Sequence, residues 1–150
     1  MEAVSRILGV TPMFVTVGAA VVLLVTRDPR FLLVLLASEL LNPLLKRACA
    51  AVLPAWVVDR PSDGGAFGCS QLGGAPSRVV GRGFPSGHAQ AMGVLLGYAS
   101  AARWRGVGWY AALAGAVGVQ RVAVGCHSPL QVVAGLATGV GIGLAFAPPT

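Results

Sequence analysis

Two histidines and two arginines lie at the ends of apolar segments, where their side chains could act together on an anion. His88 begins one apolar segment and His127 precedes another, while Arg60 and Arg121 end two others. Arginine can hold a phosphate through two parallel N–H bonds. Histidine, whose pKa lies near neutrality, can serve as a nucleophile when neutral and as an acid when protonated. These residue types therefore predict a site that attacks a phosphorus atom and protonates the departing oxygen.

The tetrapeptide Pro85-Ser86-Gly87-His88 would add backbone donors to the same site. It stands where a glycine-rich stretch gives way to an apolar segment. The first turn of a helix has N–H groups without intrahelical partners and a dipole that favours anions. We therefore expect Ser86 and Gly87 to bind the phosphate through their backbone N–H groups.

The apolar segments that must position these residues dominate the composition. Of 150 residues, 55% are hydrophobic and 11% are charged, and the mean hydropathy is +0.76. Such values are typical of integral membrane proteins. The net charge of +6 could attract nucleic acid, but the basic residues are scattered singly or in pairs and form no basic stripe. We therefore expect no nucleic-acid partner.

The apolar segments predict an all-α fold in which about five helices cross the membrane. The expected spans are Ile7–Thr26, Phe31–Val58, His88–Ala102, Val107–Val124 and Pro129–Ala147. About 20 apolar residues cover the ~30 Å hydrocarbon core of a bilayer. The first span could instead be a signal peptide, but no small-residue cleavage site followed by a polar mature domain is found. Residues 1–150 are thus expected to form one domain, a polytopic membrane helix bundle.

The second span and the segment after it depart from a plain apolar helix. Span two carries charged residues and prolines, so we expect a kinked helix that faces protein or water on one side. The glycine-rich segment Ser62–Phe84 predicts one long polar loop outside the membrane. Glycines within the later spans are expected to let helix backbones pack closely. They are Gly93, Gly97, Gly115, Gly118, Gly135, Gly139, Gly141 and Gly143.

With five spans, the two arginines and two histidines emerge on the same face of the membrane. A single arginine near the end of a span usually snorkels toward the headgroups, and a single histidine there often lies in the interface. Two of each on one face, beside tight turns that contain glycine or proline, favour an anion site.

In order along the chain, these elements resemble the three-part signature of the type 2 phosphatidic acid phosphatase superfamily, lipid phosphatases related to vanadium haloperoxidases. The resemblance rests on Arg60-Pro61, Pro85-Ser86-Gly87-His88, and Arg121 with five residues before His127, within about residues 46–134. It implies a helical membrane phosphatase that forms a phosphohistidine. It also implies His127 as the nucleophile and His88 as the general acid. The phosphate binders that it implies are Arg60, Arg121, Ser86 and Gly87.

Two positions depart from the family's pattern near its arginines. The lysine usually found seven residues before the first arginine is replaced by Leu53. Lys46, fourteen residues before Arg60, is the lysine that we expect to bind phosphate instead. Gln120 stands directly ahead of Arg121, where serine is frequent.

The third departure is Gln131, which takes the place of the aspartate that usually orients the nucleophile. A spacing of four residues puts Gln131 beside His127 on one helix face, within reach of its amide oxygen. The amide can orient the imidazole but cannot neutralise an imidazolium, so we expect aspartate to be tolerated here. The segment from His127 to Val133 resembles the dolichyl diphosphatase branch, although the glucose-6-phosphatase branch is similar. A decayed site is the alternative.

The cysteines bear on the compartment that the site faces. Cys69 and Cys126 are expected on the face that carries the histidines, whereas Cys49 lies within span two. In an oxidising compartment the first two could form a disulfide, and two free thiols are the alternative. The opposite face carries more arginines outside the site. The positive-inside rule therefore favours a lumenal or extracytoplasmic site, in the endoplasmic reticulum or plasma membrane.

The sequence as a whole predicts an integral membrane lipid phosphatase. Polyprenyl or dolichyl diphosphate is the favoured substrate and phosphatidic acid the next. We expect no metal and no cofactor, because cationic side chains and helix-start amides can hold the phosphate. The expected partners are the lipid substrate and the bilayer. The alternatives are an inactive relative that binds lipid headgroups or a partner protein, and a channel or helix-packing subunit.

Overall fold

The computed structural model describes residues 29–61, 69 and 82–148. The predicted first span, Ile7–Thr26, and most of the predicted loop at 62–84 lie outside the described residues. The described part of the chain is all-helical, and its only β-type pairing is an isolated bridge between Asp59 and Arg82. Its helices are α2 (Arg30–Val52), α3 (Ala55–Val58), α4 (Gly87–Ala101), α5 (Val107–Ala123) and α6 (Pro129–Phe146).

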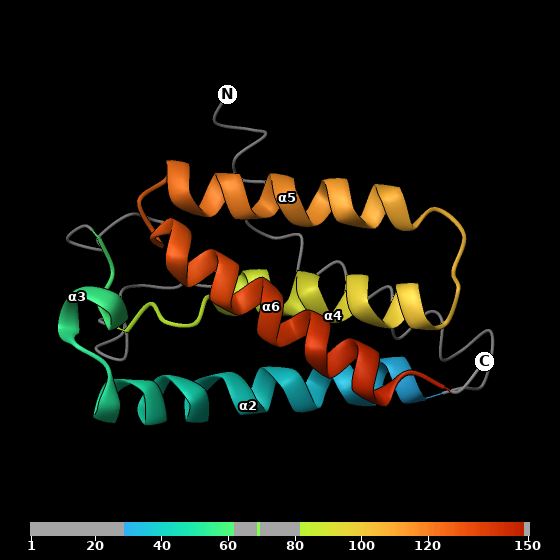
Figure 1. The fold of residues 1–150 in the computed structure, drawn as a ribbon, viewed down its shortest axis with the longest axis horizontal. Helices are drawn as coiled ribbons and strands as arrows, with labels where there is room; N and C mark the ends of the chain where they lie inside the picture. Colours follow the sequence, from blue (N-terminus) through green and yellow to red (C-terminus); the bar gives the residue numbers. More distant parts are fainter. Residues whose placement is uncertain (1–28, 62–68, 70–81, 149–150) are drawn as a thin grey trace.

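Helix α4 lies at the centre of the bundle. It contacts α2, α5 and α6, and eleven of its fifteen residues are buried. Figure 1 shows α2, α4 and α5 side by side, with α6 running obliquely across them. The first turn of α4 contains Gly87 and His88, so the central helix carries two predicted site residues at its N-terminal end.

The contact between α4 and α6 is built on glycine. A Cβ on any of five glycines would come closer than 3.0 Å to backbone atoms of the facing segment, so only glycine allows this approach. They are Gly93, Gly97, Gly135, Gly139 and Gly143. The predicted packing role is confirmed for these five and for Gly118, whose Cβ would lie 2.9 Å from Val132. For Gly115 and Gly141, no atom of the described residues lies within 4 Å of that position, so the prediction is untested there.

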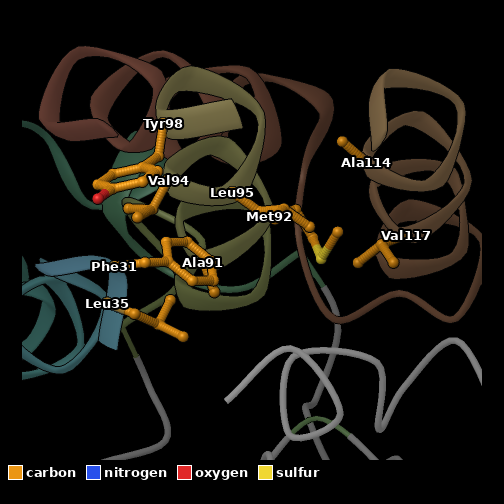
Figure 2. Close-up of a cluster of buried hydrophobic side chains, with 9 residues drawn as sticks. All are labelled: Phe31, Leu35, Ala91, Met92, Val94, Leu95, Tyr98, Ala114 and Val117. Carbon is orange, nitrogen blue, oxygen red and sulfur yellow. The ribbon is translucent and has the colours of Figure 1, made fainter. Parts of the chain in front are cut away.

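An apolar cluster joins α4 to α2 and α5 (Figure 2). Phe31 and Leu35 of α2 pack on one side of α4, and Ala114 and Val117 of α5 pack on the other. The Phe31 ring lies 5.1 Å from the Tyr98 ring, measured between centroids. Because Phe31 begins α2 and Tyr98 is near the end of α4, the two helices run antiparallel.

The predicted second span is two helices. Helix α2 runs through Pro43 without a break and ends at Val52, and α3 begins after Pro54. The residue between them, Leu53, is extended, as expected before a proline. The predicted kink is therefore a full break.

By length and composition, one of the described helices, α6 with 18 residues, could cross a membrane. Helix α4 has 15 residues and α5 has 17, so both are shorter than α6. Helix α2 is longer but carries Glu39, Lys46 and Arg47 in its interior. The five spans stay a prediction.

Candidate active site

The turn before α6 carries the predicted nucleophile. Gly125 adopts a left-handed conformation with φ of +72°, which turns the chain between α5 and the His127 segment. Ser128 caps α6, because its hydroxyl accepts a hydrogen bond from the Gln131 N–H at 3.3 Å. Pro129 occupies the first helical turn, where its missing N–H costs nothing. His127 is therefore fixed directly ahead of a well-capped helix.

The side-chain amide of Gln131 defines the tautomer of His127. Its nitrogen donates to the carbonyl oxygens of Val57 at 2.9 Å and Asp59 at 2.7 Å. Its oxygen accepts from the Ser128 N–H at 3.2 Å and lies 3.2 Å from Nδ1 of His127. An amide oxygen can only accept, so Nδ1 carries the proton and Nε2 keeps its lone pair.

His127 is buried, with 2% of its surface exposed. Burial and the positive charges of Arg60 and Lys46 lower the pKa of His127 from 6.5 to about 3, although the Gln131 bond opposes this. The imidazole is therefore neutral near pH 7, which is the protonation state of a nucleophile. Lys46, which is half-buried on α2, is therefore close enough for its charge to act on His127.

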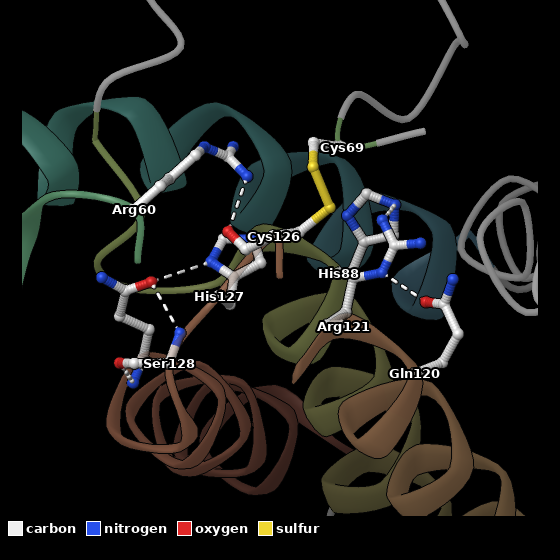
Figure 3. Close-up of a disulfide and its surroundings, with 9 residues drawn as sticks. Arg60, Cys69, His88, Gln120, Arg121, Cys126, His127 and Ser128 are labelled. Carbon is white, nitrogen blue, oxygen red and sulfur yellow. Dashed lines mark hydrogen bonds between the residues drawn. A yellow bond between two sulfur atoms is a disulfide. The ribbon is translucent and has the colours of Figure 1, made fainter. Parts of the chain in front are cut away.

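Arg60 is held against the turn that carries His127. Its Nη1 donates to the carbonyl oxygen of Cys126 at 2.9 Å (Figure 3). The chain beside it pairs with the segment ahead of α4, because the Gly83 N–H donates to the Val58 carbonyl at 2.6 Å. Burial lowers the pKa of Arg60, but a guanidinium remains charged at any physiological pH.

Gly83 permits this arrangement. A Cβ on Gly83 would lie 2.8 Å from the amide carbon of Gln131 and 2.9 Å from its nitrogen. Any larger residue would therefore displace the amide that orients His127. Gly83 was not predicted as a site residue, although its place in the glycine-rich stretch ahead of Pro85 was a signal.

The start of α4 lies beside the nucleophile's helix. The Ser86 N–H donates to the Gln131 carbonyl at 3.0 Å, and the Ser86 hydroxyl accepts from the Ala89 N–H at 3.4 Å. The backbone donor expected of Ser86 is thus already used within the protein, and a phosphate contact would fall to its hydroxyl proton. Gly87 and His88 form the first turn of α4.

Arg121 lies beside His88 near the end of α5. Its Nη1 is 3.4 Å from Nε2 of His88, and its Nε donates to the side-chain oxygen of Gln120 at 2.5 Å. A guanidinium is only a donor, so Nε2 of His88 accepts in this arrangement. Gln120, which replaces the frequent serine, orients the arginine. Both Arg121 and His88 are buried.

Cys69 and Cys126 form a disulfide, with a Cα–Cα distance of 5.4 Å. Figure 3 shows it between Arg60 and His88, directly beside the His127 turn. Cys49 has a free thiol on α2 and is half-buried. The disulfide ties residue 69 to the turn that carries His127.

The structure thus gathers every predicted site residue at one end of the bundle. They come from the last two turns of α2, the segment after α3, residue 69, the cap and first turn of α4, the end of α5, the turn after it and the start of α6. Within the described ranges, no group of three or more His, Cys, Asp or Glu side chains could hold a metal ion.

Comparison with known proteins gives one significant match. The family model described as the PAP2 superfamily matches residues 30–148. No curated protein and no solved structure matches significantly. The matched region contains every residue of the gathered site.

Proposed function

Because the chain belongs to the PAP2 superfamily, whose members are phosphatases, we propose that it is a membrane phosphatase that hydrolyses a lipid phosphate or diphosphate through a phosphohistidine. The observation that carries the mechanism is the environment of His127. Its Nδ1 is occupied by Gln131, its ring is neutral, and cationic groups lie around it. Its remaining nitrogen, Nε2, is the atom available for attack.

In the first step, the Nε2 lone pair of His127 attacks phosphorus and forms a P–N bond. The P–O bond to the leaving group breaks, and its electron pair goes to the leaving oxygen. The Gln131 carbonyl stabilises the positive ring through Nδ1–H. Arg60, Arg121 and Lys46 would balance the charge on the phosphoryl oxygens, a role that arginine serves well through paired N–H bonds.

His88 would protonate the leaving oxygen. In the described arrangement its Nε2 accepts from Arg121, so the ring must gain a proton before it can act as an acid. In the second step a water molecule loses a proton to His88 and attacks phosphorus, the P–N bond breaks, and inorganic phosphate leaves. His127 returns to its neutral state. These steps call for no metal ion and no cofactor.

We favour a polyprenyl diphosphate such as dolichyl diphosphate as substrate, with phosphatidic acid next. Gln131 in place of aspartate supports the dolichyl diphosphatase-like branch. With the diphosphate, the P–O–P bond breaks and the products are the polyprenyl monophosphate and inorganic phosphate. The lipid tail would remain in the bilayer beside a multi-pass bundle, with the site on the lumenal or extracytoplasmic face. The disulfide at the site supports that face.

The test is phosphate release by the purified full chain in detergent. The substrates are dolichyl diphosphate, undecaprenyl diphosphate and phosphatidic acid, each with EDTA or with added magnesium. We expect release in EDTA, highest for a polyprenyl diphosphate, and an acid-labile, alkali-stable phosphoenzyme on rapid quenching. Release that needs magnesium would overturn the mechanism. Binding without release of phosphate from any lipid would identify an inactive relative instead.

A further inference from the structure

Three polar side chains form a buried cluster between α2 and α4 that the proposed mechanism does not use. They are Ser38 and Asn42 of α2 and Gln90 of α4, with 2%, 7% and 1% of their surfaces exposed. Asn42 Nδ2 donates to Gln90 Oε1 at 2.8 Å. Gln90 Nε2 donates to the Ser38 carbonyl at 2.9 Å and to the Ser38 hydroxyl at 2.8 Å. We call these residues the amide cluster.

The amide cluster allows only one register between the two helices. The three hydrogen bonds of the Gln90 side chain described above all go to α2. A slip of one residue along α2 would shift each partner by ~1.5 Å and rotate it by about 100° about the helix axis. The buried amides would then lose their partners, which a low-dielectric interior penalises strongly. Apolar contacts such as that of Phe31 with Tyr98 are less directional than hydrogen bonds, so they fix the helix register less strictly.

The register matters because of what lies one turn further along α2. Ser38, Asn42 and Lys46 are spaced by four residues, so they share one face of the helix. Lys46 therefore lies ~6 Å beyond Asn42 along the axis. Helix α2 also approaches the start of α4 closely, because a Cβ on Gly87 would be 3.1 Å from Asn42 Oδ1.

We propose that the amide cluster sets the register of α2 so that the Lys46 ammonium stands at the phosphate site. Ser38, Asn42 and Gln90 are thus positioning residues, which act on the bound phosphate through Lys46. This inference rests on the proposed function, because it assigns the phosphate contact to Lys46. It explains how a lysine can serve from position 46 when Leu53 occupies the family's usual position.

The test is a double-mutant cycle on the purified full chain in detergent. The variants are Asn42→Leu, Lys46→Met and the combination of both. The measurements are the Kd for inorganic phosphate, the KM and kcat for the best lipid substrate, and thermal stability. We expect Lys46→Met to weaken phosphate binding by about 10-fold and Asn42→Leu by about 3- to 10-fold. In the Lys46→Met background, Asn42→Leu should change the Kd by less than about 2-fold.

Controls separate register from general damage. Arg47→Met removes a neighbouring exposed cation of α2, and Thr138→Val removes a hydroxyl that bonds only within α6. Both should leave the phosphate Kd unchanged. If Asn42→Leu fails to fold, Ser38→Ala replaces it in the cycle, with an expected loss of about 2-fold that Lys46→Met abolishes. The exchange Asn42→Gln with Gln90→Asn, which keeps both amides, should recover part of the affinity.

The outcomes distinguish this inference from the proposed function. Equal losses from Asn42→Leu in both backgrounds would show that the amide cluster only stabilises the fold, and would overturn the inference while hydrolysis stands. A wild-type chain that binds phosphate but releases none from any lipid would overturn the function, and the cycle would still be read from the Kd. A wild-type chain that neither binds nor hydrolyses would overturn both.

Discussion

Both ends of α4 carry buried side chains, but the two ends are built in different ways. At the C-terminal end, Tyr98 packs among aromatic rings, with its centroid 5.1 Å from Phe31 and 5.7 Å from Trp104. At the N-terminal end, the buried residues include the polar His88 and Gln90. Among the described residues, no buried side-chain nitrogen or oxygen lacks a hydrogen-bond partner. We infer that the aromatic end contributes mainly to stability and the polar end mainly to geometry.

Replacing the nucleophile gives the largest expected contrast between these ends. His127→Ala should lower kcat by about 10,000-fold or more, because the variant lacks the ring nitrogen that we propose to form the P–N bond. The phosphoenzyme should disappear, while the melting temperature changes little. Trp109→Ala, at an exposed position on α5, is the control and should keep full activity. Near-normal phosphate release by the alanine variant would reject the assignment of the nucleophile.

The acid at the start of α4 should have a smaller, substrate-dependent effect. His88→Ala should lower kcat for a lipid phosphomonoester by about 100- to 1,000-fold, because an alkoxide leaves poorly without a proton. The loss for p-nitrophenyl phosphate should be much smaller, since p-nitrophenolate needs little protonation. Steady-state rates with both substrates measure the difference. Equal losses on the two substrates would contradict the acid role.

The aromatic end should respond in the opposite way. Phe31→Ala should lower the free energy of unfolding by about 3–5 kcal/mol, the usual cost of emptying a buried aromatic site. The kcat of the molecules that remain folded should stay within about 2-fold of wild type, because Phe31 of α2 packs against the C-terminal end of α4, away from the site. Denaturation in detergent and rates corrected for the folded fraction provide the measurement. A large fall in that corrected kcat would show that the two ends are coupled.

Gln131 sharpens the comparison, because its amide cannot be replaced by a carboxylate without loss. Its nitrogen faces the carbonyl oxygens of Val57 and Asp59, and a carboxylate would repel them. We therefore reverse the expectation from sequence that aspartate is tolerated. Gln131→Glu should lower kcat by about 100-fold. The rate of phosphoenzyme formation, measured by rapid mixing, would show whether the first step is the one that slows. Activity equal to wild type would show that the N–H donors of the Gln131 amide are dispensable.

The smallest expected effect is on the pH dependence of stability. The pKa of His127 falls from 6.5 in the unfolded chain to about 3 in the folded one. Between these pH values the unfolded state binds more protons than the folded state does. The contribution of His127 to the free energy of unfolding is therefore complete above pH 6.5 and is lost as the pH falls toward 3. Melting temperatures from pH 7 to 5 should fall less steeply for His127→Gln than for wild type. Identical slopes would contradict the low pKa.

The helices were largely predictable from the sequence, because apolar runs bounded by glycine, proline and charge define them. The predicted Pro129–Ala147 span and α6, Pro129–Phe146, differ by one residue. Which of the two prolines in span two, Pro43 or Pro54, breaks the helix was not predictable. Asn42 precedes Pro43 yet stays helical, held by its bond to Gln90, whereas Leu53 before Pro54 becomes extended. Contacts between helices, which a sequence pattern does not show, decided where the break falls.

The candidate site was predictable in its side chains and not in its backbone partners. The spacing of four residues correctly places Gln131 against His127. The carbonyls of Val57, Asp59 and Cys126, which hold Gln131 and Arg60, have no signature in the sequence, because every residue carries the same carbonyl group. The register that brings Lys46 near His127 likewise depends on how α2 packs against α4.

The glycine contact between α4 and α6 has a consequence for how such a chain can diverge. His88 lies in the first turn of α4 and His127 lies directly ahead of α6. The two histidines are therefore held by helices whose backbones are in direct contact. Close-packed backbones barely compress, and their separation does not depend on which side chains face outward. Mutations can therefore reshape the outer surface, where the proposed lipid substrate would lie, while the spacing between the two histidines stays the same.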